Sequence, residues 1–235
     1  MHFQPIVDLK QNGKVIGAEA LLRWHNPQLG NIAPDRFIPL AESNGQIIEI
    51  GYFVLHQALR KAAEWCKLTT SPFKIAINIS PIQFREQRFV EYLKDMMTLY
   101  QLPPGTIELE LTEGILLQDE HYAQSALAQL RQQGISISLD DFGTGYSSLS
   151  YLQKYSFDTL KIDRSFINQL EYNEQNRELT RAIIAMAHKL NMAVIAEGVE
   201  KDYQADFVRT EGCTFAQGYL YGKAIPADDF TQLLV

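Results

Sequence analysis

The sequence predicts an α/β protein built as a closed (β/α)₈ barrel of the TIM type. Eight short apolar runs alternate along the chain with longer segments whose apolar residues recur every three or four positions. This is the pattern of strands alternating with amphipathic helices. The chain has 235 residues, and such a barrel typically takes about 250. The central runs have one bulky apolar face and one small or polar face, which suits strands around a barrel interior.

The expected elements follow one another from residue 3 to about residue 233 without a long gap. The expected strands are residues 3–9, 15–24, 74–80, 106–113, 135–141, 159–163, 192–199 and 214–221. Helical periodicity predicts helices over residues 46–66, 84–100, 119–133, 174–190 and 202–211. Gly134 follows one of these helices, at a position where glycine commonly ends a helix. Because there is no internal repeat or linker, we expect one domain, residues 1–235.

Alternation within the central runs favours a closed barrel over an open sheet. In the run 74–80, isoleucines alternate with small or polar residues such as Ala76 and Asn78, and the runs 106–113 and 135–141 alternate in the same way. Successive side chains on a strand point to opposite faces. An open doubly wound sheet is the alternative, but helices cover both of its faces and its strands read as continuous apolar runs.

Composition limits the class of ligand. The chain has 21 Lys and Arg against 28 Asp and Glu, a formal net charge of −7, so binding of duplex nucleic acid through a basic surface is not expected. Cys66 and Cys213 lie far apart and match no metal or redox spacing, so we expect two inert thiols. The spacing of the histidines gives no support for a zinc site.

The chain contains no apolar run of the about 20 residues that cross a bilayer, and its start lacks a signal-peptide pattern. We therefore expect a cytoplasmic domain without a membrane segment of its own. Because the first strand begins almost at residue 1, we also expect a module of a larger sensor protein, which could itself be anchored in a membrane.

Polar side chains stand near the ends of the expected strands, where barrel enzymes carry their active sites. These residues are Glu19, Asn78, Glu110, Asp140, Asp141, Lys161, Glu197 and Gln217. So many carboxylates in a confined space repel one another unless cations lie between them. The carboxylate and amide oxygens are hard ligands, so in the absence of thiolates or paired histidines Mg²⁺ or Mn²⁺ is the expected occupant.

The adjacent residues Asp140 and Asp141 indicate a more specific arrangement. Consecutive strand residues face opposite ways, so both can bind metal only if the strand is turning into its loop. Gly143 follows closely and permits such a turn. A carboxylate shared by two ions about 3.5–4 Å apart gives the two-metal arrangement used for phosphodiester displacement.

At these positions the sequence resembles the EAL domain family of bacterial cyclic di-GMP phosphodiesterases, over essentially the whole chain. The matching motifs are Gln4-Pro5-Ile6-Val7-Asp8, Glu19-Ala20-Leu21-Leu22-Arg23-Trp24, Asn78-Ile79-Ser80, Glu110-Leu111-Thr112-Glu113, Asp140-Asp141-Phe142-Gly143-Thr144-Gly145-Tyr146-Ser147-Ser148-Leu149, Lys161-Ile162-Asp163, Ala196-Glu197-Gly198-Val199-Glu200 and Gln217-Gly218-Tyr219. Each motif alone is weak, but together in this order they are specific. The family commonly has its first strand antiparallel to the others, so the resemblance implies a modified barrel.

The resemblance assigns metal ligands and catalytic groups. One metal ion would be held by Glu19, Asn78, Glu110 and Asp140. The second would be held by Asp140 and Asp141, with Glu197 joining directly or through water. Lys161 would position or polarise the attacking water. Catalysis would therefore depend on Lys161, Glu197, Glu19 and Asp141.

Other residues would bind the ligand or support the site. The resemblance implies that Gln4, Leu22 and Arg23 contact the ligand, with Arg23 on a phosphate. Gln217 would help to hold the solvent network, and Asp163 would stand behind the residues that touch the ligand. Glu113 would brace the loop 142–149, which in the family links the metal site to the dimer interface.

The implied reaction opens cyclic di-GMP to linear 5′-pGpG with Mg²⁺ or Mn²⁺, and Ca²⁺ would inhibit it. A homodimer attached to sensor or GGDEF-type domains is the implied setting. The departures from the family pattern are Phe3, Gly114 and the segment Lys223-Ala224-Ile225-Pro226, and none removes an expected ligand.

Other functions account for fewer of these residues. A barrel glycosidase needs only two carboxylates, which leaves Asn78 and Lys161 without a role. Asp141-Phe142-Gly143 matches a kinase metal motif, but the other kinase elements are missing from the sequence. A catalytically silent cyclic di-GMP receptor remains the alternative, because such a protein would keep the fold and the ligand but not the turnover.

Overall fold

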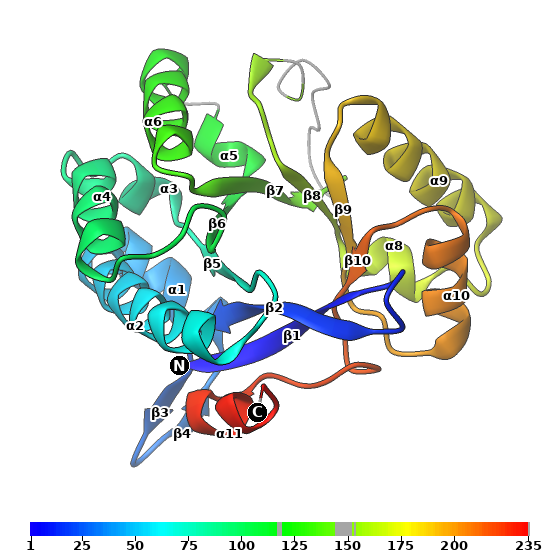
Figure 1. Ribbon diagram of the computed structural model, residues 1–235, viewed down its shortest axis with the longest axis horizontal. Coiled ribbons are helices and arrows are strands. Elements are labelled where there is room, and N and C mark those ends of the chain that lie inside the picture. The colour runs from blue at the N-terminus through cyan, green and yellow to red at the C-terminus, as the bar shows by residue number, and fades with distance from the viewer. Residues whose placement is uncertain (117–118, 144–151, 153, 235) are drawn as a thin grey trace.

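The computed structural model describes residues 1–116, 119–143, 152 and 154–234, and it shows a closed eight-stranded barrel surrounded by helices (Figure 1). The barrel strands are β1 (His2–Asp8), β2 (Lys14–Leu21), β5 (Lys74–Asn78), β6 (Ile107–Thr112), β7 (Ser136–Phe142), β8 (Thr159–Ile162), β9 (Ala193–Ala196) and β10 (Phe215–Ala216). Strands β2 and β5 to β10 pair with one another in parallel, and β10 pairs with β1 to close the barrel. The predicted barrel is confirmed.

The first strand is antiparallel to both of its neighbours in the barrel, β2 and β10, as predicted. The connection from β1 to β2 is a tight hairpin, in which the backbone N–H of Gly13 donates to the carbonyl of Asp8 at 3.0 Å. Asn12 and Gly13 both have left-handed φ angles, 60° and 76°. A connection this short leaves no room for the crossover that parallel strands need, so the pair must be antiparallel.

The helices surround the barrel on its outer side (Figure 1). They are α1 (Pro34–Ser43), α2 (Ile47–Leu68), α3 (Pro81–Phe84), α4 (Phe89–Leu99), α5 (Glu113–Leu116), α6 (Glu120–Gln132), α8 (Arg164–Asn168), α9 (Glu174–Lys189), α10 (Asp202–Thr210) and α11 (Ala227–Gln232). Three short strands complete the fold: β3 (Trp24–Asn26) and β4 (Gly30–Ile32) form a separate hairpin, and β11 (Ile225–Pro226) pairs with the start of β1. Gly134 lies just beyond α6 with a φ of 76°, as a glycine ending a helix should.

Three expected boundaries are corrected. The run 84–100 is not one helix but the end of α3 followed by α4, because α3 begins earlier, at Pro81, where Ser80 caps its first turn by accepting a hydrogen bond from Ile82. The run 15–24 ends as a strand at Leu21. The run 214–221 forms a strand over only Phe215–Ala216, because the chain after it bonds to the loop that follows β9.

The two faces of the central strands differ as predicted, one bulky and apolar and the other mostly small or polar. The bulky residues, such as Ile77, Leu109 and Leu139, are buried in one large core beneath the helices. Inside the barrel lies a small cluster, Ile6, Ala76 and Ile195. The remaining inward-facing positions are largely polar, so polar and charged side chains line the mouth of the barrel. Within the described ranges, no helix combines the length and apolar character needed to cross a membrane.

Candidate metal and substrate site

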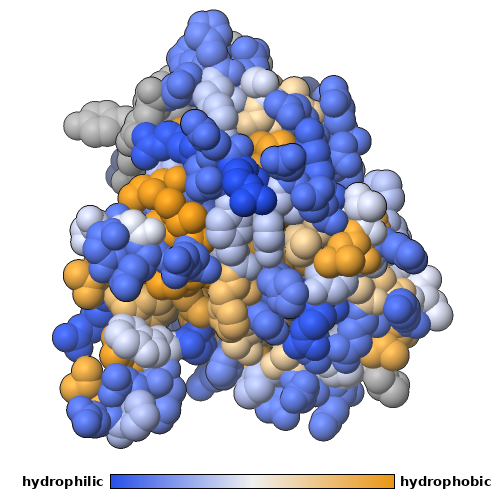
Figure 2. Space-filling view, turned by 90° about the vertical axis from the view of Figure 1, so that its left-hand side faces the viewer, coloured by the Kyte–Doolittle hydropathy of each residue, from blue (hydrophilic) through white to orange (hydrophobic). Residues whose placement is uncertain are grey.

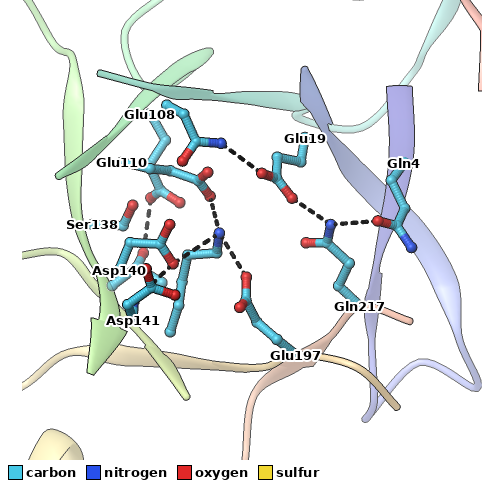
Figure 3. A network of polar contacts seen from close by, with 12 residues as sticks. Gln4, Glu19, Glu108, Glu110, Ser138, Asp140, Asp141, Glu197 and Gln217 are labelled. Carbon is cyan, nitrogen blue, oxygen red and sulfur yellow. Dashed lines mark hydrogen bonds and ion pairs between the residues drawn. The ribbon is translucent and has the colours of Figure 1, made fainter. Parts of the chain in front are cut away.

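The predicted polar residues converge at the carboxyl ends of the barrel strands (Figure 3). Glu19, Glu110, Asp140, Lys161 and Gln217 are buried, with 8% or less of each residue exposed. They come from five different strands or strand ends, and only closure of the barrel brings them together. Parallel strands present their carboxyl ends at one rim, so residues distant in sequence meet there.

Lys161 is the centre of the cluster. Its Nζ lies 2.7 Å from Glu110 Oε1, 2.7 Å from Glu197 Oε1 and 3.2 Å from Asp140 Oδ1. Burial by itself lowers the pKa of Lys161, but the surrounding carboxylates, led by Asp140 and Glu110, more than offset this effect. The pKa of Lys161 therefore lies well above its usual value, and the side chain carries a positive charge.

One ammonium group does not neutralise the carboxylates around it. Burial raises the pKa of Glu110 well above its usual value, and the charges of Glu19 and Asp140 add to that rise although Lys161 opposes it. Burial likewise raises the pKa of Glu197 to about 8, against the opposing effect of Lys161. Without metal ions the site therefore favours the protonated forms of these two carboxyls, and bound cations would stabilise their ionised forms instead.

Glu19 is held by two amides on either side of it. Asn78 Nδ2 donates to Glu19 Oε1 at 2.6 Å, and Gln217 Nε2 donates to Glu19 Oε2 at 2.5 Å. Gln217 Nε2 also donates to Gln4 Oε1 at 3.0 Å, and Gln4 Nε2 donates to the carbonyl of Gly222. Burial raises the pKa of Glu19, but Lys161 and the two amides outweigh this, so the pKa is lowered and the carboxylate is ionised.

The carboxylates of Asp140 and Asp141 lie close together although the two residues are consecutive. The pairing of β7 with β8 shifts register between Leu139 and Phe142, and Asp141 has a left-handed φ of 54°. This bulge re-aims the second carboxylate, so that oxygens of Asp140, Asp141 and Glu197 all lie within 4.8 Å of one another. Burial, and then the charge of Asp140, raises the pKa of Asp141. The prediction that the strand is turning into its loop at these two residues is wrong, because β7 continues to Phe142 and Gly143, with a φ of 97°, lies only beyond it.

The donor set fits hard divalent cations. Both carboxylate oxygens of Glu110 and the Oε1 of Gln217 are buried without a hydrogen-bond donor in suitable geometry, although one Glu110 oxygen forms the ion pair with Lys161. Asn78 uses its amide nitrogen on Glu19, and its oxygen takes no part in that bond. Buried carboxylate oxygens that lack donors are ligand atoms of the kind that Mg²⁺ or Mn²⁺ binds.

The polar residues at the carboxyl ends of the strands are called the ring below; they are Glu19, Asn78, Glu110, Asp140, Asp141, Lys161, Glu197 and Gln217. Two adjoining pockets lie over this ring and share Leu21. One, of about 320 Å³, is lined by the ring residues, including Glu19, Lys161 and Glu197. The other, of about 540 Å³, has mostly apolar walls and is lined by Leu22 and Arg23 as well as Asn78. Leu22 and Arg23 are thus beside the ring rather than in it, and the exposed Arg23 Nη1 donates to the carbonyl of Leu22 at 3.0 Å.

The apolar character continues onto the neighbouring outer surface, the side that faces the viewer in Figure 2, where apolar residues are gathered among polar ones. Trp24, Leu40 and Phe53, which come from β3, α1 and α2, are all substantially exposed. A third pocket on this side is lined by these three residues together with Leu22 and Arg23.

The two predicted supporting residues lie at the edge of the site. Asp163 caps α8 by accepting a hydrogen bond from the backbone of Ser165 at 2.9 Å, and its charge contributes to the raised pKa of Asp141. Glu113 is the first residue of α5, directly after β6. Most of the loop 142–149 that Glu113 would brace lies outside the described residues.

The ring also has neighbours that the sequence did not single out. Arg164, Glu200 and Tyr219 line the smaller pocket. Each follows a predicted site residue by one to three positions, after Asp163, Glu197 and Gln217 respectively. That proximity is a signal that could have identified them, since residues just beyond a barrel strand end lie at the active-site face.

Comparisons with known proteins agree with the geometry. The family model for the EAL domain matches residues 1–224. The chain is 42% identical over 228 residues to Pseudomonas aeruginosa MucR, named a bifunctional diguanylate cyclase/cyclic di-GMP phosphodiesterase, with 97% of this chain and 33% of MucR covered. It is 40% identical over 230 residues to Escherichia coli PdeB, named a probable cyclic di-GMP phosphodiesterase, with 98% and 43% covered.

Solved structures give the same result. The structure of the PaMucR phosphodiesterase in complex with c-di-GMP superposes with a TM-score of 0.92 at 41% identity, covering 97% of this chain and 92% of that one. The EAL enzyme Bd1971, in a form with cAMP and cyclic di-GMP bound, gives a TM-score of 0.95 at 38% identity, covering 100% and 64%. The chain spans a third of the length of MucR and less than half of the length of PdeB.

Proposed function

The chain belongs to the EAL domain family, and from that premise we propose that it hydrolyses cyclic di-GMP to linear 5′-pGpG with two divalent metal ions, Mg²⁺ or Mn²⁺. The observation that carries the proposal is the contact of Lys161 with Glu110, Asp140 and Glu197 beside the re-aimed Asp141. A site that only binds a nucleotide has no need of such a concentration of buried carboxylates.

The residues divide into two ligand groups. Glu19, Asn78, Glu110 and Asp140 would hold one ion, and Asp140 and Asp141 would hold the other, with Glu197 at or near it. When bound, the two ions would supply an activated water and would stabilise the negative charge that develops on the phosphoryl oxygens. Ca²⁺ prefers more ligands at longer distances, which supports the expectation that it inhibits.

The chain itself would orient the reactants. The Lys161 ammonium would keep positive charge beside the phosphate. It would position the attacking water through the N–H group that its longest contact, to Asp140 at 3.2 Å, would release when Asp140 binds metal. The water oxygen forms a bond to phosphorus while the bond from phosphorus to one 3′ oxygen breaks. One proton of the water ends on that 3′ oxygen, and the other is released to solvent as the new phosphomonoester ionises. The product then carries a 5′ phosphate and a free 3′ hydroxyl, so one phosphodiester remains.

The pocket beside the ring would bind the rest of the substrate. Its largely apolar walls suit the faces of a guanine base, and Leu22 lies at its border with the ring. Arg23 has its guanidinium exposed there and would bind a phosphate. Gln4 and Gln217 both line the smaller pocket and are hydrogen-bonded to each other, so each would keep a polar group near the ligand.

The larger setting is a proposal of the same kind. MucR is named a diguanylate cyclase as well as a phosphodiesterase, and this chain covers only a third of the MucR sequence. These facts support a domain that is attached to sensor or GGDEF-type domains, and the homodimer is proposed from the family resemblance. Sedimentation of the purified domain with and without cyclic di-GMP tests the dimer.

Parallel measurements of binding and turnover test the proposed activity. Purified protein is incubated with cyclic di-GMP and Mg²⁺ or Mn²⁺, the products are separated by chromatography, and binding is measured with Ca²⁺ in place of the active ion. We expect pGpG to accumulate with either active metal. Binding without pGpG would instead identify a catalytically silent receptor.

A further inference from the structure

A second polar contact lies one layer below the catalytic ring. Glu108 precedes Glu110 by two residues on β6, and Thr159 precedes Lys161 by two residues on β8. Residues two apart on a strand face the same side, so both members of each pair point into the barrel. The contacts Glu108–Thr159 and Glu110–Lys161 are therefore two parallel bridges from β6 to β8, across β7.

The lower bridge, the contact between Glu108 and Thr159, is buried, and the Glu108 carboxylate accepts two hydrogen bonds. Glu108 Oε2 accepts from Thr159 Oγ1 at 2.8 Å and from Lys74 Nζ, on β5, at 2.7 Å. Glu108 is 1% exposed and Thr159 is 2% exposed. Hydrogen bonds to a charged group in a dry interior are stronger than those in water, so this contact constrains the two strands.

The contact between Glu108 and Thr159 lies just before an irregularity in the pairing of β7 with β8. Leu139 of β7 pairs with Leu160, but the next paired residues are Phe142 and Ile162. Two residues of β7, Asp140 and Asp141, therefore lie opposite the single residue Lys161. A bulge interrupts the ladder between β7 and β8 locally, so at the level of Lys161 strand β8 pairs regularly with β9, where Lys161 is opposite Ile195, but not with β7.

We propose that Thr159 and Glu108 are positioning residues for Lys161. The hydrogen bond between them fixes β8 relative to β6 just before the bulge. This placement lets the Lys161 ammonium contact Glu110, Asp140 and Glu197 simultaneously. The inference rests on the proposed function for its kinetic consequence, but the placement of Lys161 is a separate property of the fold.

The test variant is Thr159→Val, which replaces the hydroxyl with a methyl group of similar size and leaves Lys74 on Glu108. Thr180→Val is the matched control, because Thr180 is also fully buried and donates to the carbonyl of Asn176 within α9, outside the site. Thr159→Ser, which keeps the hydroxyl, is the rescue variant. If Thr159→Val does not fold, Thr159→Ala replaces it, since it places no methyl group against the carboxylate.

We expect Thr159→Val to lower kcat about 10-fold or more, because sub-ångström to ångström displacements of a reacting group cost up to about 100-fold. The KM for cyclic di-GMP should change less than about twofold, and Thr159→Ser should recover most of the rate. Thr180→Val should lower thermal stability at most. A wild-type kcat in Thr159→Val would overturn the proposal.

A second readout does not depend on turnover. The ¹⁵N resonance of the Lys161 ammonium, identified by its loss in Lys161→Arg, should shift or broaden in Thr159→Val and remain in place in Thr180→Val. An unchanged resonance in Thr159→Val would also overturn the proposal. If the wild type makes no pGpG, the proposed function fails, and this resonance still decides whether the lower bridge positions Lys161.

Discussion

Asp140 and Asp141 are consecutive residues of β7 whose carboxylates lie on the same side of the strand, because Asp141 takes a left-handed φ of 54° at a bulge. Oxygens of both reach within 4.8 Å of each other and of Glu197. A regular strand would have sent Asp141 outward. The bulge is thus the backbone feature that turns one strand-end ligand into two.

Removing the charge of Asp141 should impair metal binding without unfolding the protein. Asparagine tolerates the left-handed region well, so Asp141→Asn should keep the fold. Its Mn²⁺ affinity, measured by calorimetry, should fall by at least about 10-fold, since changes to groups behind the ligands already cost about 10–100-fold. Asp95→Asn, on the exposed face of α4, is the control. Equal affinities in the two variants would remove Asp141 from the ligand set.

The backbone strain at the same residue predicts a separate effect on stability. A β-branched residue is poorly accommodated at a positive φ, and a left-handed conformation costs about 1–2 kcal/mol. Asp141→Val should therefore unfold in less urea than Asp141→Gly in the absence of metal ions. Identical urea midpoints would mean that the left-handed conformation is not retained in the folded protein.

The raised pKa of Glu197 predicts proton release on metal binding. Burial raises it from 4.5 to about 8 in the absence of metal. The folded state therefore holds this proton more tightly than the unfolded state. The resulting stabilisation is complete below pH 4.5 and is lost as the pH rises through 8. Between these values an arriving cation must displace the proton.

At pH 6.5, calorimetry of Mn²⁺ binding in two buffers with different ionisation enthalpies should show net proton release. The release should decrease in Glu197→Gln, which has no carboxyl proton to lose. Binding heats that do not depend on the buffer in the wild type would contradict a protonated Glu197 in the metal-free site.

The two cysteines should differ in reactivity. Burial raises the pKa of the Cys213 thiol to about 12, although hydrogen bonds with the backbone, first that of Phe215, act against the rise. Cys66 is only partly buried. At pH 8 iodoacetamide should modify Cys66 alone in the native protein and both thiols in urea, as read by mass spectrometry. Rapid native labelling of Cys213 would contradict its burial.

The ring itself was predictable because strand alternation and the barrel rule place strand-end residues together. The contacts that the ring residues make with one another could not be predicted from the sequence. The sequential strand order of the barrel puts β6 to β9 side by side, but periodicity does not define which carboxylates the Lys161 side chain contacts, here Glu110 and Glu197. The sequence predicted a turn at Asp140 and Asp141, but only the structure shows that a register shift within β7 brings the two carboxylates together.

The missed elements are those stabilised by tertiary contacts rather than by a periodic pattern. Helix α1 contains Pro39 in its interior and buries only Phe37 and Ala41, so its apolar pattern is too sparse to recognise. Strand β3 has three residues, and its Trp24 packs edge-on against Phe37 with ring centroids 5.5 Å apart. Contacts of this kind involve segments that the sequence does not relate to one another.

The most direct test of hydrolysis at the ring is ³¹P NMR of cyclic di-GMP incubated with the protein and Mg²⁺. One phosphodiester per molecule should be converted into a phosphomonoester, and the other should remain a diester. Glu19→Ala, which removes the carboxylate between Asn78 and Gln217, should abolish this change, as should EDTA. A phosphomonoester that forms equally fast in Glu19→Ala, or fails to form in the wild type with either Mg²⁺ or Mn²⁺, would contradict the proposed enzyme.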